Sequence, residues 1–327
     1  MRGLILSAGL GERLRPLTLT RAKPAIEFLN MPMLAFPYHW LDSLDLSDVV
    51  FNTHHLPESI RHAAMHTVRP TTQLHFTHED QILGSGGGIW NARFHLQWDD
   101  TFAVANGDGV ILFEESDAIE QMLRFHRHEG AFATLLVCPL EGVGTRIPGV
   151  WLDRYGEVAN FGREPSKSYL ECLHYASVML LSKRVWEFLP SGPSNILYDV
   201  FAAAIAQGER VMGYKVEGMR WFETGNVAEY LGATRSCLEL LREGGRYAEA
   251  LRGLLERFSP GYGLNSSLAD LRLIDSTAQV SPDAKLEEFA VVGRGARVDA
   301  GAHLTGCVVL PDAHVTRGET HRGEVLA

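Results

Sequence analysis

The stretch GLILSAGLGERLRPLTLTRAKP, residues 3–24, predicts a buried strand that runs directly into a glycine-rich loop. The apolar residues at its start form the strand, and Gly9 and Gly11 follow at once. Glycine permits a positive φ and close approach of the backbone, so successive amide groups can point at one anion. Two cations, Arg13 and Lys23, come later in the same stretch. On spacing alone the stretch indicates either a phosphate-binding loop or a simple tight turn.

Around this stretch, roughly the first 130 residues alternate β-rich runs with helical runs. Such alternation predicts the α/β class, with a mostly parallel central sheet covered by helices. In this architecture ligands bind at the carboxyl ends of the strands. The residues that follow the predicted strands therefore carry most weight, and they are 8–15, 52–55, 78–88 and 106–108. The second half is more mixed, with predicted strands at 133–140, 149–161, 175–182 and 210–216 and a helix from about Tyr198 to Gln207.

The C-terminal part has a different period. A predicted helix, Ala228 to Arg257, and a glycine-rich loop precede a run in which an aliphatic residue recurs at every sixth position. This period is typical of hexapeptide coils in a parallel β-helix, whose aliphatic side chains stack into one column. So short a solenoid is expected to pack against the main domain or another subunit. The aliphatic positions are Ile274, Val280, Leu286, Val292, Val298, Leu304 and Leu310.

The composition is that of a soluble globular protein with one large domain and a small appendage: 327 residues, 46% hydrophobic and 21% charged. The formal charge of -10 argues against nucleic acid as a partner. The four cysteines form no CxxC pair, which favours reduced thiols. The opening MRGLILSAG is too short for a signal peptide core or a membrane span. We therefore expect a cytoplasmic protein without a membrane partner.

The string LSAGLGERLRPLTLTRAKP, residues 6–24, resembles the signature LxAGxGxRxxPLTxxxxKP of the sugar-nucleotide pyrophosphorylase family. The resemblance covers roughly residues 1–235, and a hexapeptide tail is common in the family's mannose-1-phosphate guanylyltransferase and glucose-1-phosphate adenylyltransferase branches. It implies a Rossmann-like nucleotidyltransferase domain over 1–258, with a nucleotide half to about 130, a sugar half to about 235 and a helical connection. A left-handed parallel β-helix would follow over 265–320.

The activity implied by the resemblance joins an NTP to a sugar 1-phosphate and releases pyrophosphate. By position, Arg13 and Lys23 look like catalytic cations of the triphosphate loop. A second segment, EDQILGSGGGI at 79–89, is similar to the family's E-x-x-LGTAG stretch, which lies against the nucleobase and sugar. The nucleotide-binding residues implied by both segments are Leu6, Ala8, Gly9, Gly11, Arg13, Glu79, Gly84, Gly86 and Gly87.

Two further segments imply a Mg²⁺ site. ANGDGV resembles the family's GD signature, which assigns the metal and a catalytic role to Asp108. RWFETGN resembles W-x-D-x-G, in which a second aspartate completes the site, but here the acid is Glu223. Glutamate is a competent Mg²⁺ ligand, although its extra methylene requires a slightly different arrangement.

The sugar-phosphate site departs furthest from the family pattern. FGREP, 161–165, stands where the family has F-x-E-K-P, so Glu164 occupies the place of the lysine that holds the phosphate. Either Arg163 or Lys167 would then supply the cation. HYASV, 174–178, looks like the strand that lines the sugar pocket. The implied sugar-phosphate-binding residues are Asn106, Arg163, Glu164, Lys167 and Ser177.

Substrate identity stays open at this stage. The Glu79 segment and the tail favour GTP with mannose 1-phosphate or a related sugar, whereas GGG at 86–88 also resembles uridylyltransferases that act on amino-sugar phosphates. The departures at Glu164 and Glu223 would also suit a rival function, a regulatory homologue that binds sugar nucleotide without chemistry. The tail makes a phosphocholine-type cytidylyltransferase a weaker alternative. It also predicts assembly into a homo-oligomer, while His303 and His314 are the candidates if the tail were an acyltransferase.

Overall fold

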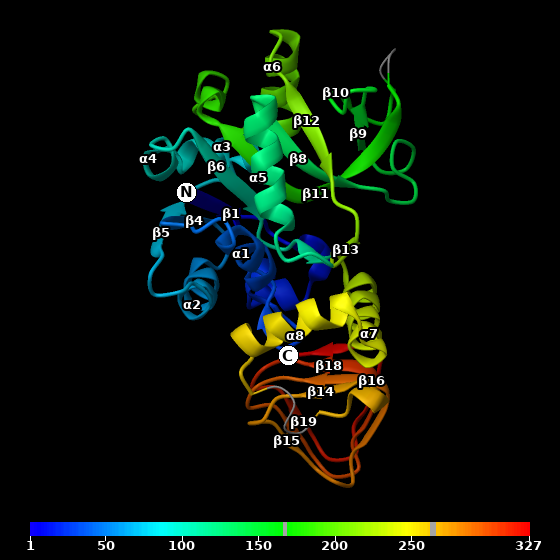
Figure 1. Cartoon of the computed structure of the whole chain (residues 1–327). Coiled ribbons are helices and arrows are strands. Elements are labelled where there is room, and N and C mark those ends of the chain that lie inside the picture. The colour runs from blue at the N-terminus through cyan, green and yellow to red at the C-terminus, as the bar shows by residue number, and fades with distance from the viewer. Residues whose placement is uncertain (166–168, 262–265) are drawn as a thin grey trace. The chain divides into compact units, whose positions relative to one another are not determined.

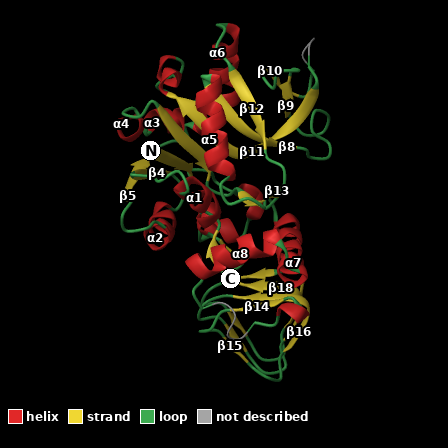
Figure 2. Cartoon of the chain, in the orientation of Figure 1, coloured by secondary structure: helices red, strands yellow, loops and turns green. Residues whose placement is uncertain are grey.

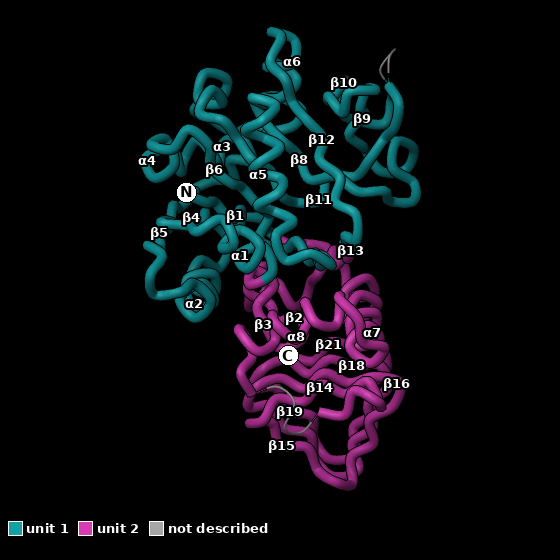
Figure 3. The backbone as a smooth tube through the Cα atoms, in the orientation of Figure 1, with its two compact units in different colours: residues 1–10, 36–221 teal, residues 11–35, 222–327 magenta. Residues whose placement is uncertain are grey.

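The computed structural model describes residues 1–165, 169–261 and 266–327. Contacts divide the chain into two compact units, drawn in teal and magenta in Figure 3. The first unit comprises residues 1–10 and 36–221, and the second comprises residues 11–35 and 222–327. This division by contacts does not test the functional domains expected from the sequence, 1–258 and 265–320, which stay a prediction. The division by contacts groups the signature residues from Gly11 onward with the C-terminal part of the chain.

Four neighbouring parallel strands form one side of the main sheet in the first unit, in the order β6-β1-β4-β5. Leu6, the last residue of β1, pairs with Asn52 on one side and Asn106 on the other. The carboxyl ends of these strands therefore meet at one edge of the sheet, as the alternating pattern predicted. The strands are β1 (Arg2–Leu6), β4 (Asp48–Thr53), β5 (Gln73–His78) and β6 (Thr101–Asn106).

The other side of the sheet is largely antiparallel, and Figure 2 shows its strands in yellow. The long strand β11 (Glu171–Ser182) runs antiparallel to β6 and also pairs with β8 and β9. This part contains β8 (Ala133–Cys138), β9 (Gly149–Leu152), β10 (Val158–Gly162) and β12 (Val211–Lys215). A separate pair that the sequence did not predict joins β7 (Val110–Phe113) to β13 (Met219–Phe222).

Helices cover this sheet and bury an aliphatic and aromatic core that includes Leu4, Val104 and Leu135. In Figure 1, α5 lies over β8, in agreement with the contacts between them, and α4 contacts β1. The α/β class with a largely parallel central sheet is therefore confirmed. The helices are α1 (Ala35–Asp42), α2 (Pro57–Thr67), α3 (Gly84–Asn91), α4 (Arg93–Leu96), α5 (Ala118–Glu129), η4 (Lys183–Glu187), η5 (Ile196–Phe201) and α6 (Ala202–Ala206).

None of the helices in the described ranges combines the length and the apolar character that crossing a membrane requires.

The second unit begins with three short 3₁₀ turns and a tight hairpin. The turns are η1 (Glu12–Leu14), η2 (Leu17–Leu19) and η3 (Lys23–Ala25), and the hairpin joins β2 (Glu27–Phe28) to β3 (Met31–Pro32). Leu29 and Asn30 make the turn with φ of 52° and 61°, the pattern of a type I′ hairpin.

This hairpin is held by the C-terminal part of the chain. The Asn30 side-chain amide donates to the carbonyl oxygen of Val292 at 3.1 Å. The Phe28 ring meets the Tyr230 ring edge-on, with centroids 5.5 Å apart. Burial raises the pKa of Glu27, and its ion pair with Arg21 opposes that rise. The hairpin that follows the signature stretch is thus packed against residues from the last third of the chain.

Two helices follow where the sequence predicted one from Ala228 to Arg257. Helix α7 (Val227–Glu243) ends at Gly244, and α8 (Arg246–Phe258) starts after Gly245. Both glycines have φ above 80°, which a continuous helix cannot accommodate. The single-helix prediction was therefore wrong at this pair of glycines, and the two helices pack against each other.

The C-terminal strands pair in parallel in two ladders, β14-β16-β18-β20 with β21, and β15-β17-β19. Lys285 pairs with His303, eighteen residues later, but Ala290 pairs with Cys307, seventeen residues later. The shift follows Glu288, whose φ is 60°. The elements are η6 (Leu268–Asp270), β14 (Arg272–Ile274), β15 (Gln279–Val280), β16 (Lys285–Val292), β17 (Arg297–Val298), β18 (His303–Val309), β19 (His314–Val315), β20 (Thr320–Arg322) and β21 (Val325–Leu326).

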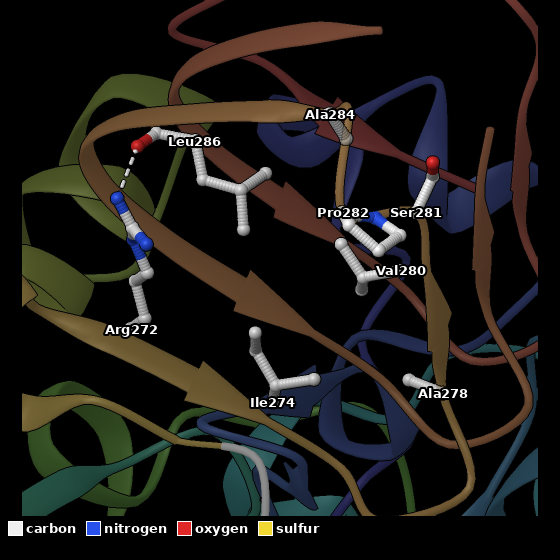
Figure 4. Close-up of a pocket in the computed structure, with 8 residues that line it drawn as sticks. All are labelled: Arg272, Ile274, Ala278, Val280, Ser281, Pro282, Ala284 and Leu286. Carbon is white, nitrogen blue, oxygen red and sulfur yellow. Dashed lines mark hydrogen bonds between the residues drawn. The ribbon is translucent and has the colours of Figure 1, made fainter. Parts of the chain in front are cut away.

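The side chains at the six-residue positions point to one interior. Ile274, Val280 and Leu286, on three successive strands, line a cavity of about 380 Å³ (Figure 4). The buried cluster continues through Val292, Val298 and Leu304. Leu310 is buried but lies outside that cluster, because the shortened spacing after Glu288 places Val309 there instead.

Candidate active site

A buried polar network joins the ends of the first three strands in the first unit. The backbone amide of Ser7, directly after β1, donates to Oδ1 of Asn52 at 2.6 Å. The Asn52 amide donates in turn to Oε1 of Glu79 at 2.7 Å, and Oε2 of Glu79 accepts from the Leu83 backbone at 2.9 Å. Asn52 and Glu79 are each only 2% exposed. Both side chains therefore act as braces between the loops that follow β1, β4 and β5.

The Glu79 carboxyl therefore organises the loop before α3, and its predicted contact with a nucleobase stays a prediction. Asn52 was missed as a site residue, although it lies among the residues after a predicted strand. The signal that could have found it is a polar side chain at the end of a buried strand, where an unpaired amide would be costly.

Replacing Asn52 with leucine, which has a similar volume, removes two hydrogen bonds and leaves an oxygen of Glu79 and the Ser7 amide unpaired. Each unmatched buried polar group costs about 1–3 kcal/mol, so we expect the free energy of unfolding to fall by about 2–6 kcal/mol. Denaturant titration measures this change. Asn91→Leu is the control, because its amide bonds only the exposed carbonyl of His78. Equal unfolding midpoints for the two variants would contradict the role of the network.

The glycine-rich segment that was predicted to touch ligand forms the start of α3. A β-carbon on Gly84 would lie 2.6 Å from the carbonyl oxygen of Ser194, and one on Gly87 would lie 2.7 Å from that of Gly192. The Gly86 amide donates to the Ser194 carbonyl at 2.9 Å. These glycines are thus required by backbone packing within the protein. Contact with a nucleotide through Gly84, Gly86 and Gly87 stays a prediction.

The loop that carries Asp108 lies at the end of β6, next to the end of β1. The Gly107 amide donates to the carbonyl oxygen of Leu6 at 2.8 Å. Ser177, from a bulge in β11, packs against this loop, since a β-carbon on Gly109 would lie 2.8 Å from that of Ser177. Ser177 has φ of 66°, a conformation that usually favours glycine. Within the first unit the structure therefore brings Ser177 together with the loop formed by Asn106 and Asp108.

The strand residues just before Ser177 are neutral near pH 7. Burial lowers the pKa of His174 and raises the pKa of Tyr175. The His174 ring contacts the Trp221 ring, with centroids 4.4 Å apart. This strand can therefore offer apolar and neutral polar contacts, while a phosphate would need its countercharge from elsewhere.

The contacts among the described residues do not identify which side chain supplies the cation for a sugar phosphate. Arg163 and Glu164 are exposed after β10, where the Glu164 carbonyl accepts from the Asn160 side chain at 3.1 Å. Within the described ranges, no hydrogen bond or ion pair joins either residue to Asn106 or Ser177. The alternative cation, Lys167, lies outside the described residues.

From Gly11 onward the signature stretch lies in the second unit. Gly11 has φ of 62°, and a β-carbon there would lie 2.9 Å from Cγ2 of Thr18 and 3.1 Å from Cβ of Lys23. The Thr18 hydroxyl donates to the Gly11 carbonyl at 3.0 Å. Lys23 is only 8% exposed, whereas Arg13 is exposed. The turn thus requires glycine at position 11. It also packs against the Lys23 side chain, one of the two predicted phosphate-binding cations.

Arg13 and Glu223 are brought together by Gly225. A β-carbon on Gly225 would lie 2.7 Å from Oε1 of Glu223 and 2.8 Å from Nη1 of Arg13, so both side chains lie against this glycine. The segment is held by the start of α7, where the side chains of Asn226 and Glu229 form a capping box. The RWFETGN segment and the signature loop therefore meet within one unit, which the sequence order alone does not reveal.

The two predicted metal ligands belong to different units, Asp108 to the first and Glu223 to the second. No cluster of three or more metal-ligating side chains occurs within the described ranges. Mg²⁺ commonly takes only one or two carboxylates and completes its shell with phosphate oxygens and water. Each carboxylate supplies the hard oxygen that this ion prefers, and a site shared by Asp108 and Glu223 stays a prediction.

The sequence profile of the nucleotidyl transferase family matches residues 2–239, and the chain belongs to this family. A probable mannose-1-phosphate guanylyltransferase 2 from Arabidopsis thaliana is 26% identical over 97% of this chain and 83% of its own. A mannose-1-phosphate guanyltransferase from Yarrowia lipolytica is 30% identical over 86% of this chain and 73% of its own. The predicted enzyme class, nucleotidyltransferase, is confirmed.

One further relative and one solved structure are also similar to this chain. A UTP--glucose-1-phosphate uridylyltransferase from Synechocystis sp. is 29% identical over 73% of this chain and 63% of its own. The crystal structure of HddC from Yersinia pseudotuberculosis, complexed with GMP-PN, superposes with a TM-score of 0.58 at 18% identity and covers 72% of this chain and 98% of its own. At that identity the likeness shows the fold alone.

Proposed function

We propose that this chain joins GTP to mannose 1-phosphate, or to a closely related sugar 1-phosphate, and releases pyrophosphate. Sugar-1-phosphate nucleotidyl transfer is supported by relatives named mannose-1-phosphate guanylyltransferase that align along most of the chain. The observation that carries the proposal is the signature loop. Its glycine turn packs on Lys23, and its Arg13 lies against Gly225 beside Glu223.

The chemistry is an in-line exchange at phosphorus. An oxygen of the sugar phosphate forms a bond to the α-phosphorus of the NTP, and the bond from that phosphorus to the α,β-bridging oxygen breaks. Pyrophosphate leaves with the electron pair, so no protein nucleophile is required. Arg13 and Lys23 stabilise the charge that grows on the leaving group, which is the main help that phosphoryl transfer needs.

Enzymes of this family generally use a divalent metal, and we propose Mg²⁺ held by Asp108 and Glu223. When bound, such an ion neutralises charge on the phosphates and orients them. Asn106 and Ser177 would contact the sugar phosphate from the loop after β6 and the bulge of β11. Arg163 or Lys167 would supply the positive charge that balances the sugar phosphate. Glu164, which lies between them in the sequence, would restrict which sugar phosphates bind.

The C-terminal strands are proposed to form a left-handed parallel β-helix. Support comes from parallel pairing at eighteen-residue and seventeen-residue spacings and from the inward Ile274, Val280 and Leu286. Assembly into a homo-oligomer through this region and a cytoplasmic location stay predictions.

Pyrophosphate release, measured with each NTP against a panel of sugar 1-phosphates, tests the function. We expect GTP with mannose 1-phosphate to give the highest kcat/KM, by about tenfold or more over UTP with an amino-sugar phosphate, because polar base edges are discriminated strongly. The reverse preference would support the alternative of a uridylyltransferase that acts on an amino-sugar 1-phosphate; the relative from Synechocystis sp. shares with that alternative the use of UTP, although it is named for glucose 1-phosphate.

If no combination of NTP and sugar 1-phosphate releases pyrophosphate, the remaining alternative is a regulatory homologue that binds without catalysis. A thermal-shift measurement tests that alternative. A ligand that binds the folded state alone raises the melting temperature by mass action. A rise with GDP-mannose in the absence of turnover would mean binding without catalysis. No rise with any nucleotide or sugar nucleotide would reject the site itself.

A further inference from the structure

We propose that His62 and His66, on the outer face of α2, form a binding site for a divalent transition-metal ion such as Zn²⁺, Ni²⁺ or Cu²⁺. This site is separate from the nucleotidyl transfer site. It rests on the spacing, exposure and hydrogen bonding of the two imidazoles.

The helix places the two imidazoles side by side. Residues four apart lie on the same helical face, and the centroids of the two rings are only 4.4 Å apart, with the planes inclined at 37°. Both side chains are exposed, whereas Ala63 and Ala64 between them are buried on the opposite side. The pair is therefore reachable from solvent, and rotation of the exposed His62 side chain can direct one of its ring nitrogens to an ion held by Nε2 of His66.

A hydrogen bond sets the tautomer of one ring. Nδ1 of His66 lies 2.7 Å from the carbonyl oxygen of His62. A carbonyl oxygen can only accept, so Nδ1 carries the hydrogen and the neutral ring presents the lone pair of Nε2. Metal-ligating histidines characteristically donate their other N–H to a carbonyl or carboxylate in this way. His66 is thus already in the form that a metal ion requires.

The ligand type decides which ions bind. Imidazole nitrogen suits Zn²⁺, Ni²⁺ and Cu²⁺, and two histidines at this helical spacing supply two of the protein ligands in known zinc sites. Mg²⁺ prefers hard oxygen ligands and would not compete. Since no group of three ligating side chains occurs in the described ranges, water would complete the coordination shell. The site should therefore be exchangeable rather than permanently filled.

The test is titration of the full chain with ZnCl₂ or NiCl₂ in the presence of saturating MgCl₂, followed by calorimetry. We expect binding at one such site, and His62→Ala or His66→Ala alone should weaken it by about 10-fold to 100-fold, because the second contact is intramolecular. His128→Ala is the matched control, since His128 is also an exposed histidine on a helix. It should leave the affinity unchanged.

A second readout does not depend on heats of binding. The EPR spectrum of Cu²⁺ bound to the protein should show coupling to two nitrogens, reduced in either single variant. The metal should also raise the melting temperature of the wild type but not of His62→Ala/His66→Ala. Equal affinity and equal spectra in the double variant and the wild type would overturn the proposal, as would absence of binding to the wild type. Both outcomes are independent of nucleotidyl transfer.

Discussion

Replacing Arg13 with alanine is expected to lower kcat by about 10²-fold to 10³-fold, the loss typical of removing one preorganised electrostatic contact to a transition state. The guanidinium lies on the signature loop and against Gly225, where it can meet the charge that grows on departing pyrophosphate. Because the side chain is exposed, its removal should leave the unfolding transition unchanged. Steady-state pyrophosphate release and a parallel thermal melt measure both quantities.

Arg15 provides the matched control for this prediction. It is two residues further along the same loop and is exposed, and it pairs with Glu12 at 3.2 Å. Surface pairs of this kind contribute little, so Arg15→Ala should stay close to wild-type activity. Turnover by Arg13→Ala that matches the control would remove Arg13 from the mechanism.

Exchanging Asp108 for asparagine is expected to lower kcat by a similar factor of about 10² or more and to raise the Mg²⁺ concentration needed for half-maximal activity. The substitution keeps the shape of the side chain but removes the negative charge that Mg²⁺ requires. The loop should remain in place, because the Gly107 amide is held by the Leu6 carbonyl. Activity measured over a series of Mg²⁺ concentrations gives both quantities.

Asp117→Asn serves as the comparison, since Asp117 is a partly exposed acid that accepts hydrogen bonds from Gln121 and Arg124 before α5. It should leave the Mg²⁺ dependence unaltered. If Asp108→Asn kept the metal dependence of the wild type with normal turnover, Asp108 would have no role at the metal.

Local patterns in the sequence predicted the features that depend on neighbouring residues. The strand before Gly9, the strand before Asp108 and the inward Ile274 all appear in the structure where short-range periodicity predicted them. The helical segment predicted for 228–257 is divided into two helices at Gly244 and Gly245, whose φ values end the first helix.

Features that depend on long-range pairing could not be predicted in the same way. The bracing role of Asn52 requires knowledge that β4 lies between β1 and β5, in one particular register. Likewise, Gly84 and Gly87 looked like ligand contacts, but the atoms that exclude a side chain there come from Ser194 and Gly192, more than a hundred residues away. A single sequence gives the residue type at such positions without naming its neighbour.

The bond from Asn30 to Val292 has a consequence for the order of events during synthesis. The ribosome makes the hairpin residues early and their partner some 260 residues later. The nascent chain can pair β1 with β4 and β6 as soon as those strands emerge, and the β2–β3 pairing is local, but the bond from Asn30 must wait for Val292. Packing of this hairpin should therefore come late in synthesis, after Val292 has been made.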